Sequence, residues 1–575
     1  MSIRTLCAAS TTTDGSSSST SPSTAAAATA AVAPSSEKTY TLETLPFDNL
    51  ALHSLPVDPQ AENFVRQVPN SVFSRVKPEP VKNPVLVAAS PSALTDLLSL
   101  APSELQRTED LASYFGGNQL LPGSETYASC YAGHQFGAFS GQLGDGAAIS
   151  LGEVVNTEGK RFEVQLKGAG PTPYSRRADG RKVLRSSIRE FLCSEAMHFL
   201  GVPTTRAAAL VTSDSLTQRD VFYNGNVINE RCSVVTRLAP SFLRFGSFEV
   251  VKPKDGYTGR AGPSSGNKEL LRQLLDYTIQ TYFPELGSLE DDKTQQYLAF
   301  YTEVIKSTAA LVAHWQGIGF THGVLNTDNM SVLGLTIDYG PYGFLDFFDP
   351  DFISNGSDNG GRYCYGKQPG REGGREGGRE GGREGKPSGQ TQQLWVLAQQ
   401  DKSKIAEIFG AENVDAVCRE LEGEMEKMRK VESVALAIEK NKGQGEGEKR
   451  KEDEEVWRGW VEKVYLPRVA KEKKEGGGWK DEKERVQAMH KANPSFVLRN
   501  WIAQDAIEAA EKQDYSRVRL VLDLLQDPYY YPEDRPKGEG EEGEGEGKGG
   551  MEELTKRYRG MTPAWAAELV CTCSS

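Results

Sequence analysis

The sequence predicts an α+β fold of two lobes, in which a mixed N-terminal lobe is followed by a mostly helical C-terminal lobe. Three segments support it, in this order along the chain: a glycine-rich segment before a strand pattern, a strand ending in a lysine before a helix with a glutamate, and a polar loop after a further helix. Apolar residues alternate in the strand patterns and recur at helical spacing in the helix patterns. Helix patterns at 394–408 and 494–525 would complete the C-terminal lobe.

Composition excludes several classes of protein. The 575 residues carry a net charge of -13, without the clustered Lys and Arg that a phosphate backbone favours, so we expect no nucleic-acid partner. The eight cysteines form neither a disulfide framework nor a zinc pattern, and only Cys571 and Cys573 are close together. No apolar run approaches the roughly 18 to 20 residues that a bilayer requires, so we expect no membrane span.

Low-complexity stretches divide the chain. Repeats of Gly, Arg and Glu cannot bury enough apolar surface to offset chain entropy, so they are interpreted as insertions. The expected regions are a disordered N-terminus or transit peptide at 1–39, a catalytic core at 40–369, an insertion at 370–392, a helical continuation of the C-terminal lobe at 393–442, a charged insertion at 443–484, a helical part of the core at 485–535, a Gly/Glu-rich linker at 536–551 and a tail at 552–575.

The first segment with functional character is glycine-rich and runs over 131–146, before a strand pattern at 147–155. Glycines before a strand allow a close approach of backbone to phosphates. The segment lacks the spacing of a Walker lysine, and glycines also serve turns. Taken alone, it leaves both interpretations open.

The second segment pairs a lysine with a glutamate. Alternation over 162–167 puts Phe162 and its apolar neighbours on one face of a strand and Lys167 on the other. A helix pattern over 186–200 follows, with Glu190 in its first turn. Glu190 could form a capping box with Ser187, or it could pair with Lys167 as the helix glutamate of kinase-like folds does. The order of glycines, lysine and glutamate favours an ATP site.

The third segment is the polar loop 321–329, placed between a helix ending near Gly317 and a strand-like run at 330–337 that leads to Asp338-Tyr-Gly. In protein kinases the catalytic aspartate lies two residues after the loop histidine. Val324 occupies that position here and cannot accept a proton. Asn329 and Asp338 remain suitable magnesium ligands, and Asp328 could act as a base or as a turn residue. The chain is therefore either catalytically silent or performs a different chemistry.

Four sequence blocks resemble the signatures of the selenoprotein O (SelO/YdiU) family. They read YAGHQFG from Tyr131, QLKGAGPTPYSR from Gln165, RLAPSFLRFG from Arg237 and NTDNMS from Asn326. The resemblance covers about 40–369 and resumes at 493–528 and at the C-terminus. It implies a protein-kinase-like fold that binds ATP in an inverted orientation and transfers AMP, with loss of diphosphate, to Ser, Thr or Tyr of protein substrates.

The resemblance also implies roles for individual residues. Asp328 matches the catalytic base, Glu190 matches the partner of Lys167, and Asn329 and Asp338 match the ligands of Mg²⁺, with Mn²⁺ as an alternative. The nucleotide-binding positions are Gly144, Gly146, Ala147, Lys167, Asp179, Gly180, Arg237, Arg244 and Asp338. Planar guanidinium groups suit the oxygens of a triphosphate, although surface ion pairing would also explain the arginines.

Two departures and two alternatives accompany this resemblance. Many bacterial members have arginine at the position of Ala147, and Lys182 or Arg185 could replace that charge. Cys571 and Cys573 resemble a redox tail in which some members carry selenocysteine at the position of Cys573, which implies a link to redox homeostasis. The family also implies a mitochondrial location. The alternatives are a silent ATP-binding pseudokinase scaffold and a phosphotransferase of the aminoglycoside-kinase type, against which Val324 counts.

Overall fold

The computed structural model describes residues 39–368 except 222, 223, 290 and 291, short pieces between 458 and 470, and residues 481–531, 548–569 and 571–572. The predicted N-terminal stretch 1–38 and most of the region 369–480, including the helix expected at 394–408, lie outside the described residues.

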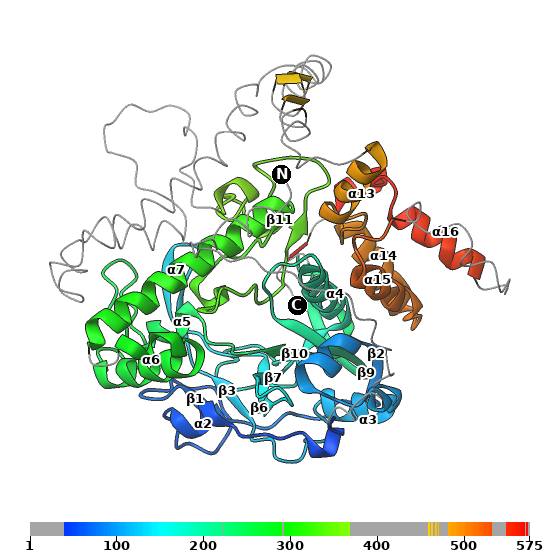
Figure 1. Ribbon diagram of the computed structural model, residues 1–575. Coiled ribbons are helices and arrows are strands. Elements are labelled where there is room, and N and C mark those ends of the chain that lie inside the picture. The colour runs from blue at the N-terminus through cyan, green and yellow to red at the C-terminus, as the bar shows by residue number, and fades with distance from the viewer. Residues whose placement is uncertain are drawn as a thin grey trace, which may run out of the picture.

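An antiparallel sheet of eight strands forms the centre of the N-terminal lobe (Figure 1). Its strand order is β1-β3-β6-β7-β10-β9-β2, and the short β8 also pairs with β10. The strands are β1 (Phe73–Arg75), β2 (Val85–Ala89), β3 (Tyr127–Ser129), β6 (Ala148–Val155), β7 (Arg161–Lys167), β8 (Lys182–Val183), β9 (Arg206–Asp220) and β10 (Val227–Ala239). Two-stranded pairs are formed by β4 (Ala132–Gln135) with β5 (Ala138–Gln142), and by β11 (Phe320–Thr321) with β12 (Gly343–Phe344).

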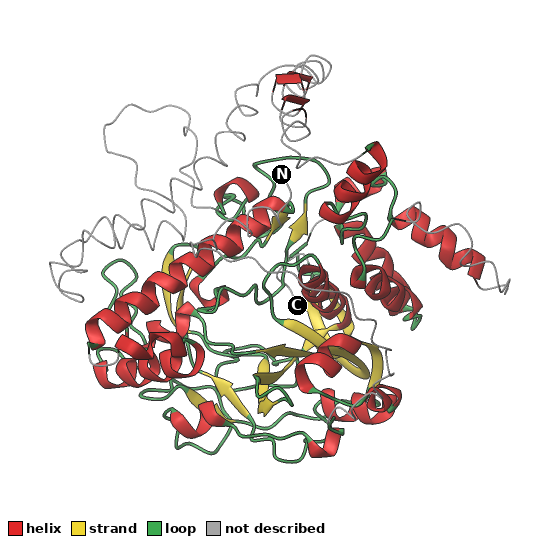
Figure 2. Cartoon of the chain, viewed as in Figure 1, coloured by secondary structure: helices red, strands yellow, loops and turns green. Residues whose placement is uncertain are grey.

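Helices lie around this sheet and are joined by loops (Figure 2). They are α2 (Leu50–Ser54), α3 (Thr108–Phe115), α4 (Leu184–Phe199), α5 (Phe245–Phe248), α6 (Lys268–Tyr282), α7 (Lys293–Gly317), α13 (Glu482–Ala492), α14 (Asn500–Glu511), α15 (Ser516–Gln526) and α16 (Lys548–Tyr558). The predicted α+β class is confirmed, with strands concentrated in the first part of the chain and helices in the second.

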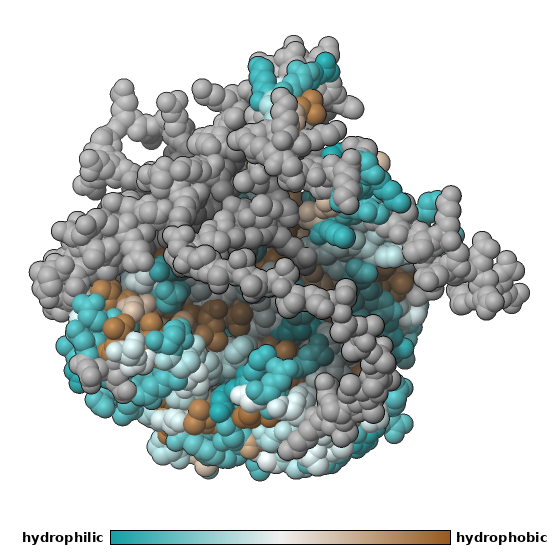
Figure 3. All heavy atoms as spheres, viewed as in Figure 1, coloured by the Kyte–Doolittle hydropathy of each residue, from teal (hydrophilic) through white to brown (hydrophobic). Residues whose placement is uncertain are grey.

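Helix α4 connects the sheet to the C-terminal helices. Ile188, Phe191 and Leu192 are completely buried, and their helical spacing forms one apolar stripe. The helix packs on β9 and β10, while α14 and α15 pack against the helix itself. Apolar residues of these elements and of the end of α7 form one continuous core cluster. On the face shown in Figure 3, hydrophilic residues predominate over the described surface and apolar ones form small patches.

Several predicted boundaries differ from the structure. Helix α4 begins at Leu184, directly after β8, so Glu190 lies in its second turn rather than its first. The capping box of Ser187 and Glu190, one of the two interpretations, is absent because Ser187 lies inside the helix, where its hydroxyl accepts a hydrogen bond from Ser233 at 2.7 Å. The pattern at 494–525 forms two helices, since the backbone turns at Gln513, whose φ is +65°.

Two further expectations were wrong in detail. The run 330–337 is not a strand: Met330 and Thr336 form a single bridge around a turn in which Gly334 has a φ of +65°. Helix α16 begins at Lys548, within the stretch predicted to be a Gly/Glu linker. By contrast, the strand ending in Lys167 and the helix ending at Gly317 are confirmed.

Candidate active site

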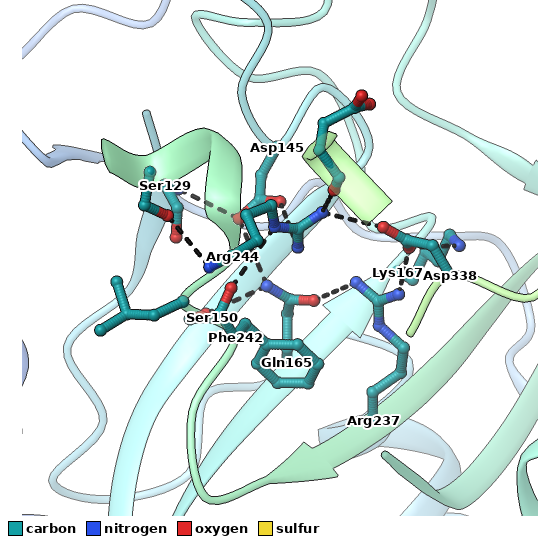
Figure 4. A network of polar contacts seen from close by, with 12 residues as sticks. Ser129, Asp145, Ser150, Gln165, Lys167, Arg237, Phe242, Arg244 and Asp338 are labelled. Carbon is teal, nitrogen blue, oxygen red and sulfur yellow. Dashed lines mark hydrogen bonds and ion pairs between the residues drawn. The ribbon is translucent and has the colours of Figure 1, made fainter. Parts of the chain in front are cut away.

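Strand register brings three polar residues together on one face of the sheet. Arg237 on β10 lies directly opposite Gln165 on β7, and Lys167 follows Gln165 by two residues, which places it on the same face. The Arg237 guanidinium donates to Gln165 Oε1, and the guanidinium also lies over the Phe242 ring at 5.1 Å (Figure 4). Both faces of β7 are thus buried, one by apolar residues and the other by this polar layer.

Glu190 on α4 faces this layer. Its Oε2 lies 2.9 Å from Lys167 Nζ, and its Oε1 lies 3.1 Å from Arg237 Nη1. The pairing of a strand lysine with a helix glutamate, one of the two interpretations of Glu190, is therefore present. In kinase-like sites this pair holds the lysine in position to contact nucleotide phosphates.

Asp338 is held by three cations (Figure 4). Its Oδ1 lies 3.0 Å from Lys167 Nζ and 2.6 Å from Arg237 Nη1, and its Oδ2 lies 2.9 Å from Arg244 Nη1. Burial alone would raise the pKa of Asp338, but the three cations hold it well below its usual value. The residue also adopts a φ of +58°, a strained conformation for a non-glycine residue that is frequent at functional sites.

The two arginines keep unused donors. Arg237 Nε and Arg244 Nη2 are buried and have no hydrogen-bond partner among the described residues. For Arg244, the carboxylate of Asp145 is 3.7 Å away, beyond hydrogen-bond distance. A buried donor without an acceptor costs about 1–3 kcal/mol, so such donors point to an anion that is absent from the structure. The oxygens of a polyphosphate fit this requirement.

The glycines of the first segment pack against a neighbouring loop. A side chain at Gly144 would meet the Tyr174 ring at 2.3 Å, and one at Gly146 would meet the Tyr174 carbonyl oxygen at 3.0 Å. Thr172 donates to the Asp145 carbonyl at 2.7 Å, which fixes this loop on the glycine turn. Close packing of the loop accounts for both glycines, and their contact with phosphate stays a prediction.

Asp179 and Gly180 lie at the end of the same loop. The Asp179 carboxylate is bonded to Arg219 at 2.8 Å and to the Thr217 hydroxyl, and its side chain is 39% exposed. Gly180 has a φ of +69°, and a side chain there would meet the Gly170 carbonyl oxygen at 2.1 Å. The loop is therefore closed tightly at its base. The structure does not place Asp179 among the partners of the three cations.

Lys182 lies beside the site, close to Ala147. The Gly168 N–H donates to the Ala147 carbonyl at 2.6 Å, and a side chain at Gly168 would meet Lys182 Cβ at 3.0 Å. Burial and the Lys167 ammonium lower the pKa of Lys182 to about 8, against the opposing effect of the carboxylates of Glu190 and Asp338. Arg185 instead pairs with Glu230, at 2.7 and 3.1 Å.

The polar loop places Asp328 and Asn329 next to the cluster around Asp338, because Arg244 contacts both Asp328 and Asp338. Arg244 Nη1 donates to the Asp328 carbonyl at 2.7 Å, and the Asn329 amide donates to the Val324 carbonyl at 3.0 Å. Burial raises the pKa of Asp328 to about 6, although a hydrogen bond from Gln135 acts in the opposite direction. The carboxylate is thus ionised at neutral pH. Val324 offers only its backbone for hydrogen bonding, so its side chain cannot accept a proton.

Asn329 and Asp338, the predicted ligands of a divalent metal, both carry side-chain oxygen atoms. Mg²⁺ prefers oxygen ligands and is usually held by one or two carboxylates together with substrate phosphates. Within the described residues, no group of three or more His, Cys, Asp or Glu side chains could hold a metal without other ligands. The binding of a metal together with a nucleotide stays a prediction.

Sequence reasoning missed several residues of this site. Asp145, Gln165, Gln135 and Glu249 are in or next to the polar network, but their partners come from distant parts of the chain. The alternation over 162–167 would place Gln165 on a solvated face, so the sequence pattern gave no signal of its burial. Cys571 lies beside Asn355, which donates to the Gly323 carbonyl at 3.2 Å, while Cys573 is outside the described residues.

The Lys167–Glu190 pair resembles the lysine–glutamate pair of kinase-like sites, whereas Val324 stands at the position of the usual kinase base. A family model for protein adenylyltransferase SelO matches residues 57–371. The mitochondrial protein adenylyltransferase SelO of Mus musculus is 42% identical over 93% of both chains, and the mitochondrial SelO-1 of Danio rerio is 41% identical over 93% of this chain and 94% of its own. A protein nucleotidyltransferase YdiU from an Azoarcus strain is 44% identical over 85% of this chain and 94% of its own.

The chain belongs to the SelO family. The predicted family, the adenylyltransferase activity and ATP as co-substrate are confirmed by these matches. The predicted mitochondrial location agrees with the names of the vertebrate relatives. No helix in the described part of the chain is long and apolar enough to cross a membrane.

Proposed function

We propose that Asp328 is the base that accepts the proton of a Ser, Thr or Tyr hydroxyl on a protein substrate, and that Lys167, Arg237 and Arg244 bind the triphosphate of ATP. The observation that carries the proposal is the cluster around Asp338, where two buried arginines keep unpaired donors. Fixed cations at the place where charge develops are a large source of catalysis in phosphate transfer.

The reaction proceeds by one displacement. The hydroxyl oxygen attacks the α-phosphorus, the bond from that phosphorus to the bridging oxygen breaks, and diphosphate leaves. The hydroxyl proton passes to the Asp328 carboxylate, and the product is an AMP ester of the side chain. Asn329 and Asp338 would hold Mg²⁺ or Mn²⁺ through their side-chain oxygens, and the metal would neutralise negative charge on the phosphates. An inverted orientation of ATP is required, so that the α-phosphate faces the acceptor.

Lys182 supplies the charge that is absent at Ala147. Gly168 neighbours both residues, and the Lys182 side chain is close enough to Lys167, Glu190 and Asp338 to interact with their charges. The other candidate, Arg185, is occupied by Glu230. A lysine at this position adds a fourth cation for the phosphates.

The position of the label tests the reaction. The purified protein is incubated with a protein substrate and Mg²⁺, and with ATP labelled at either the α- or the γ-phosphate. We expect covalent label from α-labelled ATP alone. Label from γ-labelled ATP alone would indicate a phosphotransferase. Binding of ATP, seen as a thermal shift, without any covalent label would indicate the silent scaffold.

Regulation through the terminal cysteines stays a prediction. Cys571 is partly exposed, and its carbonyl accepts a hydrogen bond from Gly356 at 2.8 Å. The neighbouring Asn355 donates to the Gly323 carbonyl of the polar loop, so a change at Cys571 on oxidation would reach the polar loop through Asn355. Comparison of label transfer before and after treatment with a reductant, in the native chain and in Cys571→Ser, tests this link.

A further inference from the structure

The hairpin of β4 and β5 lies along the polar loop. His134 N donates to Thr327 Oγ1 at 2.8 Å, Gln135 Nε2 donates to Asp328 Oδ2 at 3.0 Å, and Phe136 N donates to Asn326 Oδ1 at 3.2 Å. Three consecutive hairpin residues therefore bond three consecutive loop residues. None of these hairpin residues belongs to the cluster around Asp338.

The tip of the hairpin is fixed in one conformation. Phe136 and Gly137 form its two-residue turn and have φ values of +49° and +81°. Two-residue hairpin turns often need positive φ at both positions, which is unfavourable for phenylalanine. Phe136 is held there because its N–H also bonds the Tyr363 hydroxyl at 2.9 Å and its ring packs on Tyr363 at 5.2 Å. Strain kept at a site in this way is a common mark of function.

A second set of bonds fixes the base of the hairpin. Glu249 accepts from the Thr327 hydroxyl at 2.7 Å and lies 2.7 Å from His134 Nδ1. With the bond from His134 N to Thr327, these contacts close a triangle of His134, Glu249 and Thr327. The hairpin and the loop thus share one rigid connection on each side of Gln135.

The carboxylate of Asp328 has a single side-chain hydrogen bond. Gln135 provides it at Oδ2, whereas Oδ1 is buried without a hydrogen-bond partner among the described residues. Oδ1 lies against Gly133, where an added side chain would approach it to 3.2 Å. Among the described residues, Gln135 thus makes the one side-chain hydrogen bond that orients the carboxylate, and glycine at position 133 leaves the space beside Oδ1 open.

We propose that Gln135 is a positioning residue, which holds the Asp328 carboxylate in the orientation that accepts the substrate proton. This inference rests on the proposed role of Asp328 as the base. Misplacement of a reacting group by about 1 Å can cost on the order of 10²-fold in rate, so loss of one orienting bond should affect the chemical step strongly. Binding of ATP depends on other residues and should not change.

The test replaces Gln135 with methionine, which keeps the length of the side chain and removes the donor. The matched control is Gln119→Met, because Gln119 is exposed and donates to the Tyr114 hydroxyl at 3.2 Å, outside the site. Transfer from α-labelled ATP is measured as kcat and KM, together with the affinity for ATP and the thermal midpoint. We expect kcat to fall about 10- to 100-fold in Gln135→Met, with ATP affinity within about twofold of the native chain.

A double variant separates positioning from general structure. If Gln135 acts through Asp328, adding Gln135→Met to Asp328→Asn should cause no further loss, because residues that act as one unit are not additive. A wild-type kcat in Gln135→Met, or an equal loss of kcat, ATP affinity and thermal midpoint, would overturn the inference while leaving Asp328 as the base. Full transfer by Asp328→Asn alone would instead overturn the proposed function.

Discussion

Asp338 and Asp328 are two carboxylates of one site in opposite surroundings. Asp338 is surrounded by Lys167, Arg237 and Arg244, which keep its pKa well below the usual value. Among the described residues, the Asp328 carboxylate accepts a side-chain hydrogen bond from the neutral Gln135 at Oδ2 and has no partner at Oδ1, and burial raises its pKa to about 6. Environments that separate two carboxylates in this way assign them different roles. The comparison suggests that Asp338 organises cations and phosphate, whereas Asp328 exchanges a proton.

The largest expected effect comes from removing Asp338. Asp338→Ala leaves three largely buried cations without their shared partner, and loss of one member of a buried ion pair costs about 3–5 kcal/mol. We therefore expect a clear fall in the thermal midpoint and loss of label transfer. Differential scanning calorimetry and α-label transfer measure the two effects. An unchanged midpoint would contradict the role of Asp338 as the centre of the cation cluster.

A smaller effect is expected from Lys182→Met. Loss of one charge-assisted contact with phosphate, about 1.5–3 kcal/mol, should weaken ATP binding by about 10-fold or more. Because the pKa of Lys182 is about 8, the native affinity should fall as pH rises through 8, and the variant should lack this dependence. Calorimetric titration with ATP from about pH 6.5 to about pH 9, a range that brackets this pKa, measures the dependence.

The control for this experiment is Arg185→Met, whose guanidinium is paired with Glu230. Its ATP affinity should equal that of the native chain. Equal losses in both variants would show that Lys182 has no special contact with the phosphates.

The smallest effect on transfer is expected from Glu163, a buried carboxylate outside the cation cluster. Burial raises its pKa from 4.5 to about 7 in the folded chain. When the pKa of a carboxyl group is higher in the folded than in the unfolded chain, the protein has its full stability at pH values below the unfolded pKa. That stability falls as the pH rises from the unfolded to the folded pKa, here from about 4.5 to about 7. At 1.36 kcal/mol for each unit, the loss is on the order of 3 kcal/mol.

Glu163→Gln should therefore be more stable than the native chain at pH 8 and equal to it at pH 4, as measured by urea unfolding. Its acceptor oxygen can still receive the Phe242 N–H, which is 3.1 Å from Glu163 Oε1. Transfer activity should stay unchanged, which would show that a raised pKa alone does not mark a catalytic carboxylate. If the variant were less stable than the native chain at pH 8, the ionised Glu163 would not lower the free energy of unfolding, and the expectation would be wrong.

Local patterns predicted the parts of this fold that depend on local order. Alternation placed Lys167 on a strand and the apolar stripe placed Glu190 on a helix, and the order of these segments favoured their pairing, which the structure has. The strand expected at 330–337 failed, because a turn at Gly334 replaces it. Apolar composition alone does not separate a strand from a buried turn.

The contacts that orient Asp328 could not be predicted in the same way. Gln135 and Glu249 reach the polar loop from separate segments of the chain, and neither lies in a pattern that indicates its partner. The resemblance to the SelO family assigned roles to individual residues, but it gave no contact between the hairpin and the loop. Such contacts follow from the tertiary structure only.

Asp328→Asn is the variant that tests the separation of the two carboxylates most directly, because asparagine keeps the shape of the side chain and can still accept from Gln135. The measurement is transfer from α-labelled ATP at saturating nucleotide, together with the affinity for ATP. We predict native ATP affinity and a loss of transfer of about 10²- to 10⁴-fold, the usual contribution of a positioned base. Transfer at the native rate would contradict the account, since Asp328 would then not be the proton acceptor.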